Sequence, residues 1–307
     1  MSLVKRFVAT SLATLALSAL HAEPRCPGNV ASSTLRRIQD DLIVVRVLIN
    51  RTGPYDFLVD TGSQITTIDP VLASDLHLRI EGTAGVSGVA TQSRSAFAFL
   101  DLIEVGSHSV PQSLAVIQDI AALKAADPRI RGILGENFLS HFDLLIDNRQ
   151  QILCLDESRI LAQAVKGEHI PLEQPQGPRD DLPFTRPMIV SARLTTAGVA
   201  PVLLLLDSGS NVALLYTAQP RLLRASVSRA PVLKRVVDGA EQAFAVLPHQ
   251  DILVGACPVR QVSFVIPMNG VGSGPSPRED GLLPTSAFER VFISYSKNYA
   301  AFDPWVR

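Results

Sequence analysis

The feature that most constrains this chain is a pair of segments in which an apolar run ends in an acidic turn. Residues 57–63 read Phe-Leu-Val-Asp-Thr-Gly-Ser, and residues 204–210 read Leu-Leu-Leu-Asp-Ser-Gly-Ser. The two aspartates, Asp60 and Asp207, lie 147 residues apart. A short apolar run bounded by turn residues is typical of a buried strand. The pattern therefore predicts two carboxyl groups at two strand ends, and their repetition suggests that the carboxyl groups meet.

Shorter matches at almost the same offset predict an internal duplication. The Ala-Phe-Ala at residues 96–98 recurs at 243–245, and the Val-Gly at 105–106 recurs at 254–255. A third match, at an offset of 149, pairs Gly132, Ile133 and Leu134 with Gly281, Leu282 and Leu283. Offsets that drift by only two residues indicate two equivalent halves.

The chain is predicted to be mostly β. Short β-branched runs alternate with Gly, Pro, Ser and Asn, and only residues 119–126 and 136–141 suggest short helices. Five prolines between residues 166 and 187 predict a linker. The predicted organisation is a signal peptide at residues 1–22, a first lobe at 35–165, the linker at 166–187 and a second lobe at 188–307.

The N-terminus predicts export. Lys5 and Arg6 precede an apolar segment at residues 7–20, and small residues lead to a cleavage site after Ala22. The apolar segment is shorter than the roughly 20 residues that a membrane-spanning helix needs. We expect a periplasmic or secreted protein with no membrane span after signal removal; an uncleaved anchor is the alternative.

Composition excludes several other classes. A formal net charge of −1 gives no electrostatic reason to expect a nucleic-acid partner. The Cys and His residues show no metal-ligand spacing, so no metal and no cofactor are expected. An oxidising compartment would allow one disulfide among Cys26, Cys154 and Cys257, in any of the three pairings.

The two acidic turns carry a definite chemistry if they meet. Two carboxyl groups about 3 Å apart share one proton, so one acts as a base towards water while the other polarises a carbonyl. Gly62 and Gly209 permit close backbone approach, and Thr61 and Ser208 supply hydroxyls. Hydrogen bonds to a carboxylate from Ser63 and Ser210 would lower the pKa values of the pair. We therefore expect activity on the acid side of neutral, with a shift upward when both serines become alanine.

On these residues the chain resembles the aspartic protease superfamily. It is similar to the bacterial retropepsin-like type, with two lobes in one polypeptide in the manner of pepsin. The resemblance covers roughly residues 35–305 and is carried by Asp60-Thr61-Gly62-Ser63, Asp207-Ser208-Gly209-Ser210, Gly132-Ile133-Leu134-Gly135 and Asp280-Gly281-Leu282-Leu283. It implies two retropepsin-like β-barrel lobes related by a pseudo-twofold axis, with a cleft between them.

The resemblance also implies roles for these residues. Asp60 and Asp207 would form the catalytic dyad, and Thr61 and Ser208 would interlock their loops. The apolar-Gly segments would thread beside those loops and hold them. A flap over the substrate is expected at residues 82–94, with Gly82, Gly85 and Gly88.

Two features depart from the family pattern. Pro284 stands where the second apolar-Gly segment calls for glycine, which puts the support of the second loop in doubt. The candidate flap has no tyrosine, unlike pepsin-like enzymes, and could be a surface hairpin without a catalytic role. Residues 229–242 are either a second flap or a barrel edge.

The leading hypothesis is an exported aspartic endopeptidase acting on a protein or peptide substrate. The alternative is a peptide-binding module of the same fold that does not cleave. We expect a monomer in which the lobes pair within the chain, although pairing with another chain is also compatible with the sequence. A purely structural role of both turns is the remaining alternative.

Overall fold

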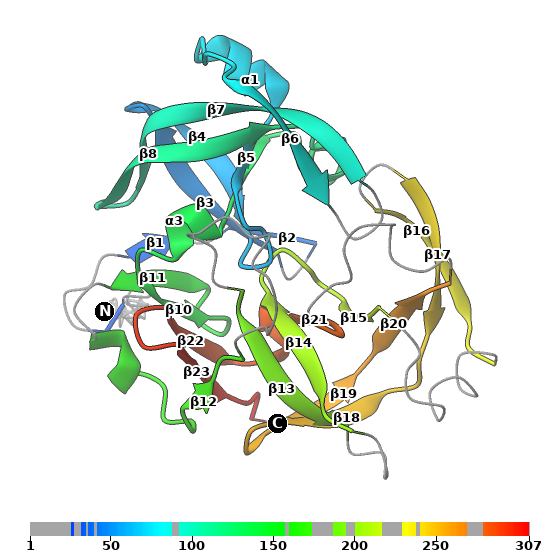
Figure 1. The fold of residues 1–307 in the computed structure, drawn as a ribbon. Helices are drawn as coiled ribbons and strands as arrows, with labels where there is room; N and C mark the ends of the chain where they lie inside the picture. Colours follow the sequence, from blue (N-terminus) through cyan, green and yellow to red (C-terminus); the bar gives the residue numbers. More distant parts are fainter. Residues whose placement is uncertain are drawn as a thin grey trace, which may run out of the picture.

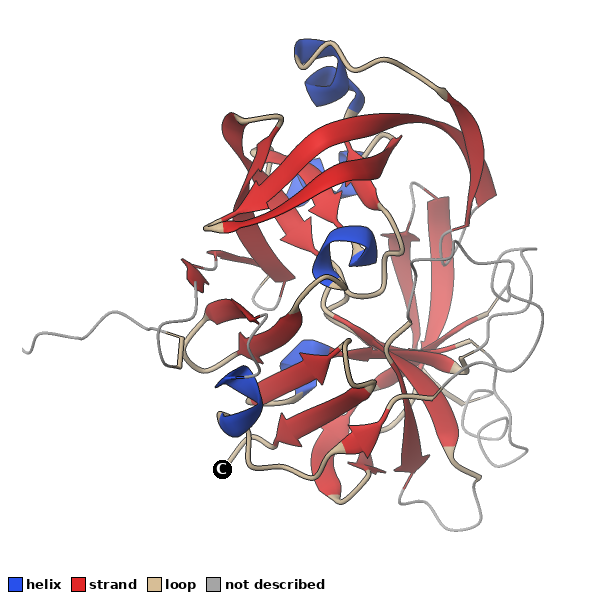
Figure 2. Cartoon of the chain, turned by 60° about the vertical axis from the view of Figure 1, so that its left-hand side comes forward, coloured by secondary structure: helices blue, strands red, loops and turns tan. Residues whose placement is uncertain are grey.

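The computed structural model describes residues 26–27, 32–34, 36–39, 42–87, 92–156, 160–173, 187–194, 200–216, 229–237, 240–268 and 279–306. Within these ranges the chain is mostly strand, with a few short helices between the strands (Figure 2). None of the helices in the described ranges is long and apolar enough to span a membrane. The predicted signal peptide at residues 1–22 lies outside the described residues, as does Gly88.

The first half builds a sheet that, among the described residues, has eight strands in the order β2-β3-β4-β9-β5-β8-β7-β6. It occupies the upper part of Figure 1. Its β3 is buried along nearly its whole length, with Arg46 the exposed exception, which is typical of an interior strand. The strands are β2 (Arg36–Ile38), β3 (Leu42–Ile49), β4 (Thr52–Val59), β5 (Thr66–Ile68), β6 (Gly82–Ser87), β7 (Gln92–Val105), β8 (His108–Ile117) and β9 (Ile130–Leu134).

The second half builds a sheet of nine described strands in the order β16-β17-β20-β15-β21-β14-β13-β18-β19. Its central strands are largely buried: β14 contains four consecutive leucines, and β21 contains Leu282 and Leu283. The strands are β13 (Ile189–Leu194), β14 (Val202–Asp207), β15 (Ala213–Leu215), β16 (Val232–Val237), β17 (Ala240–Val246), β18 (Gln250–Val254), β19 (Cys257–Val262), β20 (Phe264–Pro267) and β21 (Gly281–Pro284).

Corresponding strands pair in the same sense in these two sheets. In the first, β4 is parallel to β9, β9 is antiparallel to β5, and β5 is parallel to β8. In the second, β14 is parallel to β21, β21 is antiparallel to β15, and β15 is parallel to β20. The matched pairings fall on the segments that the sequence offset relates.

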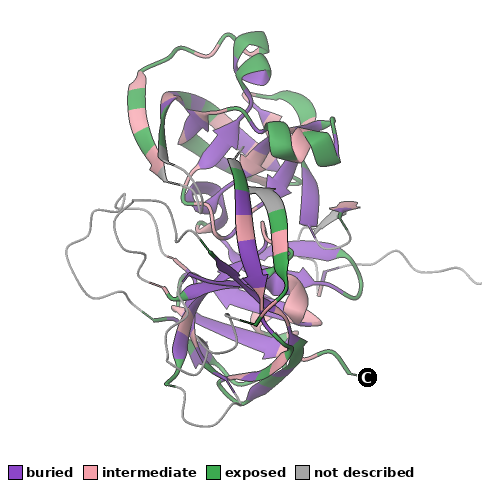
Figure 3. Cartoon of the chain, turned by 90° about the vertical axis from the view of Figure 1, so that its right-hand side faces the viewer, coloured by how far each residue is buried: buried purple, intermediate pink, exposed green. Residues whose placement is uncertain are grey.

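A third sheet joins the halves, with the described order β1-β11-β10-β22-β23-β12. At its centre β10 and β22 run antiparallel, with Leu145 opposite Phe292. Its strands are β1 (Ser32–Thr34), β10 (Asp143–Asp147), β11 (Ile152–Asp156), β12 (Ile170–Pro171), β22 (Arg290–Ser294) and β23 (Tyr299–Asp303). The main buried cluster contains side chains from all three sheets, including Val47, Leu144 and Leu204, so one core spans the halves (Figure 3).

The predicted linker is partly ordered. Ile170 pairs with Ala300, and both Ile170 and Leu172 are buried in the main core. Its first residues therefore complete the shared sheet, because alternate apolar side chains there find a buried face. Residues 174–186 of this segment lie outside the described residues.

A disulfide resolves the open cysteine pairing. Cys26 is bonded to Cys154, and Cys257 is free and buried. Ser32 of β1 lies opposite Cys154 of β11, so the disulfide fastens the start of the chain to the strand with which it pairs.

The short helices are α1 (Pro70–Asp75), α2 (Ala121–Ala126), α3 (Glu136–Leu139), η1 (Ile160–Gln163) and η2 (Thr285–Ala287), the last two being 3-10 helices. The predicted helices at 119–126 and 136–141 correspond to α2 and α3. Helix α1 was not predicted, although Asp69 caps it by accepting hydrogen bonds from the backbone N–H groups of Val71 and Leu72.

Candidate active site

The two predicted aspartates occupy equivalent places in the two sheets. Asp60 follows β4 directly, and Asp207 is the last residue of β14. We call residues 60–65 the first Asp loop and residues 207–212 the second Asp loop. Asp60 is half-buried and Asp207 is buried. Each carboxyl group thus lies at the end of a strand, β4 or β14, and the residues just before it are in the core.

Hydroxyl groups interlock the two Asp loops. The Thr61 hydroxyl donates to the carbonyl oxygen of Leu206 at 2.7 Å, and the Ser208 hydroxyl donates to that of Val59 at 2.8 Å. In return, the backbone N–H of Thr61 donates to Ser208 Oγ and that of Ser208 donates to Thr61 Oγ1, both at 3.1 Å. All four bonds are buried and cross between the halves, so they fix the position of one loop against the other.

The glycines of the two loops face the opposite carboxyl groups. A Cβ atom on Gly209 would stand 2.4 Å from Cγ of Asp60, and one on Gly62 would stand 2.9 Å from Cγ of Asp207. Only glycine leaves room for this approach. The same glycines donate their N–H groups to the aspartate of their own loop, at 2.8 Å for Gly62 and 2.7 Å for Gly209.

The two carboxyl groups are hydrogen-bonded to each other and differ in their proton affinity. Burial raises the pKa of Asp60, while hydrogen bonds from Gly62 and Ser63 and from Asp207 act against that rise. Burial and the nearby charge of Asp60 raise the pKa of Asp207 well above its usual range. The arrangement therefore favours one shared proton, held by Asp207 beside an ionised Asp60.

The expected role of the serine hydroxyls is wrong. Ser63 Oγ donates to the carbonyl oxygen of Ile65 at 3.1 Å, and Ser210 Oγ donates to that of Val212 at 2.9 Å. Each hydroxyl thus closes its own turn by a local bond to the carbonyl oxygen two residues ahead. The backbone N–H groups of Ser63 and Ser210 instead lower the pKa values of Asp60 and Asp207.

The two apolar-Gly segments lie beside the Asp strands, as the resemblance implies. Phe57, Leu58 and Val59 pair with Gly132, Ile133 and Leu134, and the backbone N–H of Asp60 donates to the Leu134 carbonyl. In the second half, Leu204 to Asp207 pair with Gly281, Leu282, Leu283 and Pro284. Cβ atoms at Gly132 and Gly281 would lie 2.4 Å from the Thr67 carbonyl oxygen and 1.9 Å from that of Leu214, so these positions require glycine.

Residues after Gly135 also hold the first Asp loop, and Asn137 among them was not predicted to do so. The N–H groups of Glu136 and Asn137 donate to the carbonyl oxygens of Ser63 and Gln64, at 2.8 and 3.1 Å. Asn137 Oδ1 accepts from the N–H and the hydroxyl of Thr66, at 2.7 and 2.9 Å, and its Nδ2 donates to the Leu114 carbonyl. No sequence signal singles out Asn137, because its burial and its partners are seen only in the structure.

The predicted flap segment is a β-hairpin. β6 and β7 pair in register from Gly82 opposite Phe97 to Ser87 opposite Gln92. Gly82 packs against the ring of Phe97, and Gly85 has open space where a side chain would be. The second-half segment at 229–242 also forms a hairpin, in which β16 pairs with β17. The ends of both hairpins lie on the same side of the molecule in Figures 1 and 2.

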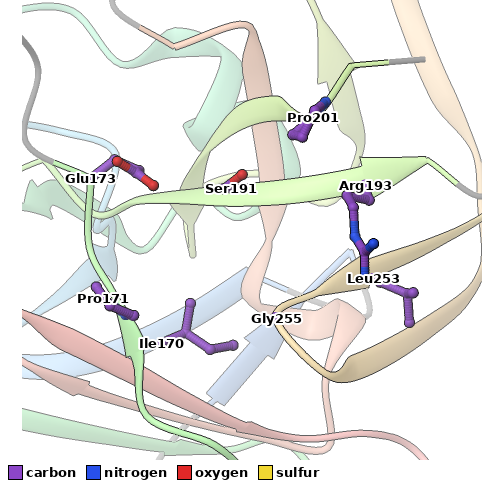
Figure 4. A pocket seen from close by; sticks show the side chains of 8 residues that line it. All are labelled: Ile170, Pro171, Glu173, Ser191, Arg193, Pro201, Leu253 and Gly255. Atoms are coloured by element: carbon purple, nitrogen blue, oxygen red, sulfur yellow. The ribbon is translucent and has the colours of Figure 1, made fainter. Parts of the chain in front are cut away.

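A separate pocket of about 290 Å³ lies away from the Asp loops, between residues 170–173 and the outer face of β13 and β18. Glu173 and Arg193 stand at different ends of it, and Leu253 lies next to Arg193 (Figure 4). Its walls contain no residue of either Asp loop. In the described part of the chain no three His, Cys, Asp or Glu side chains are placed to hold a metal ion.

Comparison with known proteins suggests protease activity. Residues 45–138 match the family model described as Aspartyl protease, which takes in the first Asp loop, the first hairpin and the segment from Gly132 to Phe138. No curated protein matches the chain. The family match suggests a peptidase and hence a peptide substrate, and it leaves the second half to be judged from its own geometry.

Proposed function

We propose that this chain is an exported aspartic endopeptidase that hydrolyses peptide bonds with a water activated by Asp60 and Asp207. The observation that carries the proposal is the crossed contact of the Asp loops, in which each glycine packs on the opposite carboxyl group. A purely structural turn has no need to bring a second buried carboxyl group into hydrogen-bonding range. The family match to residues 45–138 supports the reaction class.

In the proposed mechanism the two carboxyl groups have different tasks. The ionised Asp60 takes a proton from a water held between the carboxyl groups, and the oxygen of that water attacks the scissile carbonyl carbon. Asp207 gives its proton to the carbonyl oxygen, so a neutral gem-diol forms without a covalent enzyme intermediate. Asp60 then gives its proton to the amide nitrogen while Asp207 takes one from a gem-diol hydroxyl, so the C–N bond breaks, the acid and amine form, and the dyad is left with one proton again.

The proposal includes the two-lobed organisation of the chain, its monomeric state and its two flaps. Matched strand pairings in the two large sheets support a duplication with pseudo-twofold symmetry and lobes at residues 35–165 and 188–307. The shared sheet supports pairing of the lobes within one chain, and thus a monomer of the bacterial two-lobed, retropepsin-like type. The hairpins at residues 82–94 and 229–242 are the candidate flaps.

The disulfide supports export. A bond between Cys26 and Cys154 forms and persists in an oxidising compartment such as the periplasm or the outside of the cell. It lies just beyond the predicted cleavage site after Ala22, so signal removal would leave it intact. We propose a periplasmic or secreted protein.

The test is cleavage of a diverse peptide mixture across pH by residues 23–307, beside Asp60→Asn and Asp207→Asn. Both variants are expected to lose cleavage while remaining folded. Asp143→Asn is the matched control, because Asp143 is a buried aspartate that accepts from the Ser294 and Ser296 hydroxyls, away from the dyad. A folded wild type that binds peptides without cleaving them at any pH would favour the alternative, a peptide-binding module. That alternative is motivated by Pro284, which stands where the family pattern has glycine.

A further inference from the structure

The two Asp loops are not held in the same way by their own halves. In the first half, the backbone N–H groups of Glu136 and Asn137 donate to carbonyl oxygens of the first Asp loop. Among the described residues, no backbone hydrogen bond joins the corresponding residues of η2 to the second Asp loop. Pro284, which precedes η2, lies opposite Asp207 in the pairing of β14 with β21. A support for η2 therefore acts on the position of Asp207.

Asn148 of the first half provides a support for η2. It follows β10 and is buried, and its Nδ2 donates to the carbonyl oxygens of Thr285 and Phe288, both at 2.9 Å. Thr285 is the first residue of η2, and Phe288 comes directly after its last residue. One side-chain amide thus holds both ends of this helix from the opposite half of the chain.

Arg37 fixes the orientation of that amide. An asparagine side chain donates through its nitrogen and accepts through its oxygen, so Asn148 holds η2 only while the nitrogen faces the two carbonyl groups. Nη2 of Arg37 donates to Oδ1 of Asn148, and hydrogen bonds from a charged donor are among the strong ones. Because Oδ1 is bound by Arg37, Nδ2 is directed at η2.

Arg37 belongs to β2, which is fastened to the first half by its neighbour in the strand. Arg36 donates to Asp56 of β4 at 2.6 Å and also to Asp127, which follows α2. Successive side chains of a strand point to opposite faces. Arg36 therefore binds the first half on one side, while Arg37 reaches Asn148 on the other.

The same stretch of chain meets the second Asp loop. Gln39 comes directly after β2, and its Oε1 lies 3.5 Å from Nδ2 of Asn211 in that loop. Before β2, the disulfide between Cys26 and Cys154 and the pairing of β1 with β11 hold the chain on the shared sheet. We call residues 36–39 the strap. It is fixed to the first half and contacts the support of the second Asp loop and the loop itself.

We propose that the strap positions the second Asp loop, with Arg37 acting through Asn148 to hold Asp207 against Asp60. Both are positioning residues, since Asn148 contacts η2 and Arg37 contacts Asn148. The inference rests on the proposed function. Catalysis by the dyad needs both carboxyl groups at one water, so a small displacement of Asp207 lowers the rate without removing a group that binds peptide.

The experiment compares kcat and KM of Asn148→Ala and Arg37→Ala with those of the wild type, in the chain from residue 23 to 307. We expect kcat to fall about tenfold to a hundredfold for Asn148→Ala and by less for Arg37→Ala, with KM little changed. The double variant should be no slower than Asn148→Ala alone, because Arg37 acts through Asn148.

The pH profile is the measurement that a merely structural role would leave unchanged. The charge of Asp60 raises the pKa of Asp207, and the hydrogen bond from Asp207 lowers the pKa of Asp60. A looser contact weakens both effects, so in Asn148→Ala the alkaline limb should move to lower pH and the acid limb to higher pH. A structural role alone would lower the amount of active protein without bringing the limbs together.

Arg149→Ala is the matched control. Arg149 follows Asn148 and pairs at 2.6 Å with Glu289, the residue after Phe288, so it joins the same two segments without contacting η2. Its side chain is largely exposed, and its loss should leave kcat and both limbs in place. A folded Asn148→Ala variant with wild-type kcat and limbs would overturn the inference, as would equal changes in Arg149→Ala. If Asn148→Ala does not fold, Arg37→Ala decides in its place.

The inference and the proposed function can fail separately. If the wild type shows no dyad-dependent cleavage at any pH, the proposed function fails, and an NMR titration of the Asp60 and Asp207 carboxyl carbons tests the strap instead. The two apparent pKa values should move towards each other in Asn148→Ala and keep their wild-type separation in Arg149→Ala. Unmoved values in folded Asn148→Ala would overturn the inference.

Discussion

The two Asp loops present the same groups but are supported by different means. Beneath the first loop, Gly135 leaves room for the backbone of Ile65, and Asn137 binds both polar groups of Thr66. The corresponding second-half positions are Pro284 and Ser286. Proline has no N–H to donate, whereas the Gly135 N–H donates to the Thr66 hydroxyl at 3.2 Å.

The difference indicates which of the two loops is held by its own half of the chain. The two loops are already tied to each other by the crossed hydrogen bonds of Thr61 and Ser208. If one loop is held rigidly by its own half, the crossed hydrogen bonds hold the other loop in place as well. The first half therefore acts as the anchor of the site, and the second loop tolerates Pro284 because it is held from across the interface.

The largest expected effect comes from Gly135→Ala. The new Cβ would lie 2.6 Å from the Ile65 carbonyl carbon, which is backbone and cannot move aside without displacing the first Asp loop. We expect a loss of about 3 kcal/mol in the free energy of unfolding, measured with urea, together with lost activity. Pro284→Ala is the matched change in the second half and should cost about 1 kcal/mol or less. Equal losses at both positions would contradict the assignment of the anchor to the first half.

Asn137→Ala is expected to have the next largest effect. It leaves the Thr66 N–H and the Leu114 carbonyl without their side-chain partner in a buried site. Unsatisfied buried groups of this kind cost about 1–3 kcal/mol each, so we expect a loss of about 2–3 kcal/mol in urea unfolding. Ser286→Ala, the matched change, should stay within about 0.5 kcal/mol. Comparable losses in the two variants would show that both loops are braced alike.

Much of this comparison could be anticipated from the sequence, because it depends on local patterns. Apolar runs ending in Asp-Thr-Gly and Asp-Ser-Gly fixed the strand ends, and their offset matched the strands that pair in the same sense. The departure at Pro284 was also visible in the sequence. The sequence could therefore indicate which residues occupy equivalent positions in the two Asp loops and in the segments beside them.

Contacts made over long distances in the chain were less accessible. The sequence allowed three pairings of the cysteines. The bond between Cys26 and Cys154 follows from the pairing of β1 with β11. The Ser63 and Ser210 hydroxyls had two acceptors within reach, a carboxylate and a carbonyl, and composition does not choose between them. Asn137 is an ordinary residue in the sequence and acquires its role only through contacts with Thr66 and Leu114 of neighbouring strands.

A smaller effect on the free energy of unfolding is expected from Asp60→Asn and Asp207→Asn, and it should differ between the two loops. In the unfolded chain both aspartates titrate near 3.8, while the folded pKa of Asp60 is raised and that of Asp207 is raised further. The folded state therefore keeps a proton that the unfolded state has lost, and stability falls as pH rises through that window. Asp207→Asn should remove this loss and stabilise the protein above the window, by more than Asp60→Asn.

The measurement for the dyad is urea unfolding of the wild type and both variants at about pH 3 and about pH 8. The variants should differ little from the wild type at the lower pH, where both carboxyl groups are protonated in either state. At the higher pH the gain should be greater for Asp207→Asn. A greater gain for Asp60→Asn would reverse the proposed assignment of acid and base.

The smallest expected effect is that of Ser63→Ala and Ser210→Ala, made singly and together. Each hydroxyl donates to a carbonyl within its own loop, so each loss should cost only about 0.5–1 kcal/mol. The pH limits of activity should stay in place, because the groups that lower the pKa values of the two aspartates are backbone N–H groups that alanine retains. The two loops are thus expected to respond alike here, in contrast to their response at Gly135 and Pro284. An upward shift of the profile in the double variant would instead mean that the hydroxyls turn towards the carboxylates in solution.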